Sequence, residues 1–137
     1  MKKFLLTLIL TLGFIFPSFA QTYWYRTTAF AIKSVNAYGI WGPWSDWQKS
    51  NMDVSINTDD NIITIYSPVK QVYVILRYEG SYTDESGGIQ REFTVIDQDL
   101  DKGKIRLRIE KNGNSQLYVD FANIIWVYNI TIIPKTS

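Results

Sequence analysis

The stretch that decides the fold is KIRLRIEKNGNSQLYVDF, residues 104–121. Ile105, Leu107 and Ile109 alternate with charged residues, which is the pattern of a β-strand with one buried face and one wet face. The second half of the stretch begins after an Asn-Gly pair and alternates in the same way. The stretch therefore predicts two neighbouring antiparallel strands joined by a tight turn.

The register of this hairpin follows from the length of its loop. A two-residue Asn-Gly turn would place Leu107 opposite Tyr118, because a one-residue slip turns every side chain to the other face. A three-residue loop, residues 111–113 with a left-handed Gly113, pairs Leu107 with Leu117 instead. We predict the three-residue loop.

The same alternation marks strands along the rest of the chain. The positions that we expect to face inward are Met52, Val54 and Ile56; Ile63 and Ile65; Val72, Val74, Leu76 and Tyr78; and Phe93 and Val95. Residues 23–33 and 124–132 are predicted to form two longer terminal strands, and the second, which is apolar on both faces, is expected to be covered on both.

About eight strands at roughly ten-residue spacing predict an all-β fold, a single small antiparallel meander. A meander must protect its two edge strands, either by closing into a barrel or by folding into a sandwich. We favour the closed barrel. A barrel of this size either fills its interior with side chains or encloses one small ligand, and the pattern leaves both outcomes open.

The first twenty residues have the three-part layout of a secretory signal. Lys2 and Lys3 precede an apolar run over residues 4–16, and residues 17–20 add a proline and small residues. The run is shorter than the roughly 20 residues that span a bilayer as a helix. We expect residues 1–20 to be a cleaved signal peptide and residues 21–137 to be one β domain, periplasmic or secreted, without membrane insertion.

Composition narrows the function. Without residues 1–20, the chain has 117 residues, of which 12 are basic and 13 acidic, a balance that does not attract nucleic acid. It contains no Cys for a disulfide or a lipid anchor, so its core must hold the fold. It also lacks His, the commonest general base and transition-metal ligand. We expect a protein that is not an enzyme and has no cofactor.

Three tryptophans, Trp41, Trp44 and Trp47, are the candidate binding residues. Their spacing of three sends consecutive side chains to opposite faces of a strand, so at least one should reach the surface. We favour an interpretation in which they plug one barrel end. The alternative is an aromatic platform for sugar rings or a protein surface. The motif resembles the tryptophan run of thrombospondin type 1 repeats, but the disulfides and arginine run of that family are absent.

Asp97, Asp99 and Asp101 form a D-x-D-x-D pattern like that of a calcium loop. An EF-hand loop requires Gly at position six and Glu at position twelve, whereas this chain has Lys102 and Arg108 there. We favour a polar turn in which aspartate side chains cap backbone N–H groups, with no metal. Weak calcium binding is the alternative.

One set of segments resembles small uncharacterised exported proteins of gut Bacteroidetes and their phages. The segments are Trp44–Trp47, Gln71–Tyr73, the aspartates of 97–101, Gln116–Phe121 and Trp126–Tyr128. The resemblance spans most of the chain after residue 20 and implies a Gram-negative envelope or secreted setting. It implies no activity, and no functional residue is carried over.

The leading hypothesis is an exported, non-enzymatic β domain that binds a protein or glycan near Trp41–Trp47. A second is a barrel of lipocalin-like architecture that holds a small ligand, which requires a cavity of several hundred cubic ångströms. A third is an enzyme inhibitor that projects residues 80–89 as a rigid loop. The oligomeric state stays open.

Overall fold

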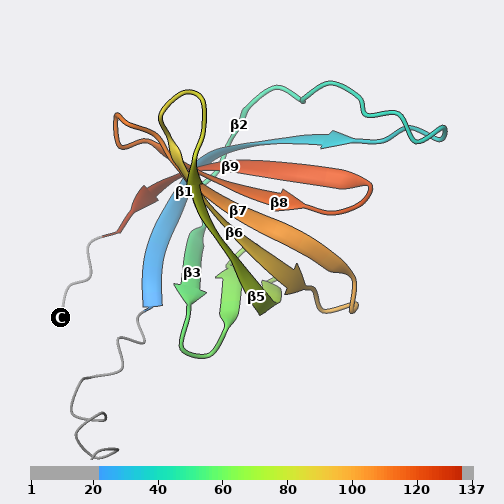
Figure 1. The fold of residues 1–137 in the computed structure, drawn as a ribbon. Helices are drawn as coiled ribbons and strands as arrows, with labels where there is room; N and C mark the ends of the chain where they lie inside the picture. Colours follow the sequence, from blue (N-terminus) through green and yellow to red (C-terminus); the bar gives the residue numbers. More distant parts are fainter. Residues whose placement is uncertain (1–21, 134–137) are drawn as a thin grey trace, which may run out of the picture.

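The computed structural model describes residues 22–133, and all regular elements among them are β-strands (Figure 1). The strands are β1 (Thr22–Ser34), β2 (Gln48–Lys49), β3 (Asp53–Asn57), β4 (Ile62–Ile65), β5 (Gln71–Thr83), β6 (Ile89–Ile96), β7 (Lys102–Ile109), β8 (Ser115–Asp120) and β9 (Ile124–Ile132). The expected signal peptide, residues 1–20, lies outside the described residues. Within them, no helix has the length and hydropathy to cross a membrane.

The strands form one closed antiparallel barrel. β1 pairs with β3, each later strand pairs with the next, and β9 pairs back onto β1. The prediction of a closed eight-strand barrel is confirmed, and the sandwich is wrong. The described residues contain one strand more than predicted, the two-residue β2 on the free edge of β1.

The predicted β7–β8 hairpin is confirmed. Leu107 lies opposite Leu117. Gly113 has a φ of 92°, a left-handed conformation that favours glycine, and its N–H donates to the Glu110 carbonyl at 2.9 Å. Leu117 and Leu107 are 0% and 6% exposed, so the alternation from which this register was inferred does mark the core.

The barrel interior contains a hollow at each end, of about 690 Å³ where β1 begins and about 420 Å³ at the opposite end. We call the end at which β1 begins and β9 ends the open end, and the opposite one the closed end. Aromatic residues pack at the closed end, where the ring centroids of Tyr73 and Phe121 are 6.0 Å apart and those of Trp126 and Tyr128 are 6.4 Å apart. Aliphatic side chains such as Val95 and Val119 complete this layer.

The prediction for β5 is wrong in its first half. Tyr73 and Ile75 face the core, whereas Val74 and Leu76 are 42% and 51% exposed. Residues 71–76 are apolar at nearly every position, so alternation does not tell the two faces apart. The register then shifts between Ile75 and Arg77 and again between Tyr78 and Gly80. A bulge inserts one residue and reverses the faces that follow, and strict alternation cannot anticipate it.

β9 is covered on both faces, as predicted. Tyr128 faces the interior and is 1% exposed, and its neighbour Val127 faces outward and is 3% exposed. Val127 lies opposite Ala31 of β1, which is also buried. Part of the outer wall is therefore packed against other residues and not left to solvent.

β1 changes partners at Thr27. Its first residues pair with β3, its later ones pair with β2, and the register with β9 shifts between Thr27 and Ala29. Thr27 is fully buried, and its hydroxyl accepts from the Met52 N–H at 2.8 Å and lies 2.7 Å from the Ser50 hydroxyl. These bonds hold the chain where it passes from β2 to β3.

We expect Thr27→Val to lower the free energy of unfolding by about 1–3 kcal/mol, because it leaves the Met52 N–H without its acceptor in a partly buried position. Urea denaturation measures the change. The matched control is Thr27→Ser, which keeps the hydroxyl and should lose less. Equal losses in the two variants would contradict this role for the hydroxyl.

Candidate functional site

The open end of the barrel contains a cavity of about 690 Å³. Its walls are formed by residues of strands β1, β3, β5, β6 and β7, by the β3–β4 turn and by the end of β9. The lining residues are Tyr23, Tyr25, Ile56, Thr58, Asn61, Ile75, Leu76, Arg77, Tyr78, Arg91, Phe93, Leu107, Ile109 and Ile132. The volume lies within the range of about 300–1,000 Å³ typical of small-molecule sites.

The cavity exists because the inward side chains of the open end do not fill it. Aliphatic residues such as Ile56 and aromatic residues such as Tyr25 line it together, and the closed end has a smaller hollow of about 420 Å³. The deep wall is apolar and no more than 9% exposed, and Phe93 belongs to it. Polar groups lie toward the mouth, where Tyr23 and Tyr78 are about half exposed.

Two polar side chains line the cavity from opposite walls. Tyr25 comes from β1 and Arg91 from β6, and these strands are four places apart in the ring of eight in either direction. Burial raises the pKa of the Tyr25 hydroxyl, and the positive charge of Arg91 opposes that rise.

Arg91 differs from the other arginines. Arg26, Arg77, Arg106 and Arg108 each form an ion pair with a carboxylate. Arg91 forms none within residues 22–133, and the side chains of Arg91 and Tyr25 make no hydrogen bond in that part of the chain. No Asp or Glu lines the cavity. The site combines an apolar interior with an uncompensated positive charge.

The three tryptophans lie on the outer wall. Residues 41–50 run beside the free edge of β1, where Ser45 exchanges backbone and side-chain hydrogen bonds with Ile32. The Trp44 ring meets the edge of Tyr118, an outward residue of β8, with centroids 6.4 Å apart. The interpretation that these tryptophans plug a barrel end is wrong, because Trp44 packs on the outside.

The same segment forms a partly exposed aromatic patch. The Lys33 ammonium lies 4.9 Å from the centre of the Trp44 ring and 5.6 Å from that of Trp41. Trp41, Trp44 and Trp47 are 41%, 41% and 51% exposed. Part of each ring therefore remains accessible to a partner, while Trp44 also packs on the wall.

We expect Trp44→Ala to lower the free energy of unfolding by about 1–2 kcal/mol, because it removes the ring that packs against Tyr118 on the outer wall. The comparison variant is Trp47→Ala, since no ring contact of Trp47 occurs among the described residues, and it should lose less. Thermal melts of the two variants test this. An unchanged melt for Trp44→Ala would mean that Trp44 contributes nothing to the wall.

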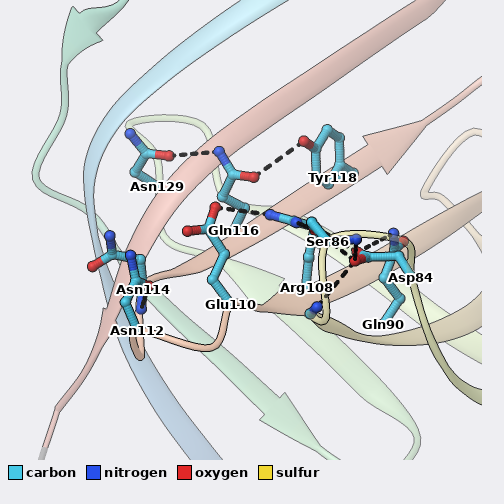
Figure 2. Close-up of polar contacts among 11 residues, drawn as sticks. Asp84, Ser86, Gln90, Arg108, Glu110, Asn112, Asn114, Gln116, Tyr118 and Asn129 are labelled. Carbon is cyan, nitrogen blue, oxygen red and sulfur yellow. Dashed lines mark hydrogen bonds and ion pairs between the residues drawn. The ribbon is translucent and has the colours of Figure 1, made fainter.

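A polar network covers the outer wall near the open end (Figure 2). The Arg108 guanidinium donates to Asp84 at 2.9 Å and to Glu110 at 2.8 Å, and its side chain is only 18% exposed. Farther along the wall, Tyr118 donates to Gln116, which in turn donates to Asn129. The network links strands β6 to β9 on the side away from the lumen.

Asp84 fixes the β5–β6 turn. Its carboxylate accepts from the Ser86 hydroxyl at 2.7 Å and from the Gly88 N–H at 3.0 Å. Hydrogen bonds from Ser86, Arg108 and Gln90 hold the pKa of Asp84 well below its usual range. Residues 80–83 and 89 of the projecting loop envisaged for an inhibitor are strand, and the remaining turn is tied to β7.

The depressed pKa makes Asp84 a source of acid sensitivity. Its ionised form stabilises the fold above the unfolded pKa of 3.8, and that contribution is lost as the pH falls below this value toward the folded pKa. We expect Asp84→Asn to weaken the fall in unfolding free energy between about pH 5 and about pH 2. Urea titrations at several pH values measure it. Asp59→Asn, in an exposed turn, is the control and should keep the steeper fall.

The aspartate turn matches the favoured interpretation. The Asp97 carboxylate accepts from the N–H groups of Asp99 and Asp101 at 2.9 and 2.8 Å, which is the predicted backbone capping. One carboxylate oxygen from each of the three aspartates lies within 4.8 Å of the others. The cap accounts for the pattern without an ion, and calcium binding stays an untested alternative.

Comparison of the chain with protein-family models, with curated proteins and with solved structures found no match. The site must therefore be interpreted from its own geometry. The sequence left a filled interior and a ligand cavity both open, and it did not single out Arg91. One signal was present in the sequence. Arg91 belongs to the same alternating series as Phe93 and Val95, the inward residues of β6, so a charged residue occupies a core-facing position.

Proposed function

We propose that this protein binds a small, mainly apolar molecule in the open end of its barrel, without catalysis. The observation that carries the proposal is the cavity of about 690 Å³, the feature by which a ligand-holding barrel differs from a filled one. Buried apolar side chains such as Phe93 and Leu107 would exclude water from the ligand. No carboxylate of the described residues lines the cavity to act as a general base.

The binding of a protein or glycan at Trp41–Trp47 is the second candidate. It is favoured by the exposure of these rings and by Lys33, which adds a charge between two of them. We rank it below the cavity because Trp44 already packs on Tyr118 and so has less free surface to offer. Export to the periplasm or beyond, through the leader at residues 1–20, is part of the proposal for both candidates.

The test uses the neutral apolar dye N-phenyl-1-naphthylamine, whose fluorescence rises in an apolar environment. We expect saturable binding at one site per chain. Ile109→Trp adds bulk to the cavity lining and should weaken dye binding about tenfold or more. Val69→Trp adds the same bulk at a position that is 82% exposed and should leave dye binding unchanged.

Trp44→Ala separates the two candidates. If the dye binds in the cavity, this variant keeps its affinity for the dye even if its melt is lower. Loss of dye binding in Trp44→Ala, with affinity kept in Ile109→Trp, would overturn the cavity in favour of the outer patch. Absence of saturable binding by the unmodified protein would reject the proposal. Circular dichroism verifies that each variant is folded.

A further inference from the structure

Arg91 is the charged side chain of the cavity lining that remains available to pair with a ligand. Its guanidinium offers five N–H donors, and no carboxylate of residues 22–133 pairs with it. The other arginine of the lining, Arg77, is already bound to Glu79 at 2.7 Å. A ligand that fills the cavity displaces water from Arg91, and a charge that loses water without gaining a partner is costly.

Tyr25 adds a second donor on the facing wall. It is 8% exposed, and its hydroxyl makes no hydrogen bond with the described residues. Tyr25 and Arg91 line the same cavity from facing walls, on strands β1 and β6. A phenol O–H and a guanidinium together match the two oxygens of one carboxylate.

We infer that the ligand is an amphipathic carboxylate, with its anionic head on Arg91 and Tyr25 and its apolar body along Ile56, Phe93 and Leu107. The inference rests on the proposed cavity function and specifies its ligand class. The positions agree with this orientation. Arg91 is exposed and lies on the mouth side of Phe93 along β6, while the apolar residues form the buried wall. The binding of an anion would also balance the only uncompensated charge of the lining.

The experiment is displacement of the neutral dye by two ligands that share a chain length and differ in charge. The ligands are decanoate and decanamide at neutral pH. We expect decanoate to displace the dye from the unmodified protein at a concentration about tenfold lower than decanamide, because hydrogen bonds that involve a charged group are the stronger ones.

Substitutions assign the preference to the residue. Arg91→Gln should remove the difference between decanoate and decanamide while leaving the dye affinity near its original value. Arg26→Gln is the matched control, because it removes an arginine from the outer wall of β1, where Arg26 pairs with Asp53, and should keep the full preference. Tyr25→Phe should reduce the preference in part.

Each outcome bears on a different claim. Equal displacement by decanoate and decanamide would overturn the carboxylate inference while the cavity function stands. A preference for decanoate that persists in Arg91→Gln would overturn the role of Arg91. Failure of the dye and both ligands to bind would reject the cavity function itself. Loss of the preference in Arg91→Gln alone would support the inference.

Discussion

The pairing of β1 with β9 is the constraint on which the rest of the structure depends. Without it, the sheet would present two long edges with unpaired N–H and C=O groups. The register runs from Tyr25 opposite Ile132 to Ser34 opposite Ile124, along most of both strands. β1 can follow β9 this far because the bulge after Thr27 lets it bend away from β3. Residues 41–50 then cover the edge that β3 no longer occupies.

Closure creates a lumen, and the choice of side chains decides how much of it remains empty. Tyr73, Phe121, Trp126 and Tyr128 occupy the closed end with rings in mutual contact. Aliphatic and aromatic side chains together line the open end and leave about 690 Å³, and the closed end retains about 420 Å³. The outer wall has its own supports, among them the edge-on contact of Trp44 with Tyr118 and the Arg108–Asp84 ion pair. These contacts lie outside the lumen and do not occupy the open end.

How much the sequence predicts depends on the contrast between the two faces of each strand. Around Leu107 and Leu117 apolar and polar residues alternate cleanly, and strand, register and turn were all predicted correctly. Around Val74 both faces are apolar, and two bulges change the alternation within ten residues, so the facing was predicted wrongly. The sequence left a filled interior and a ligand cavity both open, because the volume depends on side chains from six strands whose relative heights no local pattern records. Nor did the tryptophan spacing reveal that Trp44 packs on the outside, since that requires Tyr118, which lies 74 residues later.

Arg91 links the architecture to the choice of ligand. An arginine at an inward position is tolerated in the empty barrel because the mouth is open and water can solvate the charge. A neutral ligand of the right size would gain from the apolar wall but would also strip that water, so part of its binding free energy would be lost. An anion of the same shape replaces the water with a charge-assisted hydrogen bond. Specificity would then come as much from the penalty on neutral molecules as from attraction to the anion, because discrimination is a difference between two affinities. A filled core would not require Arg91, whereas a binding site that selects anions would.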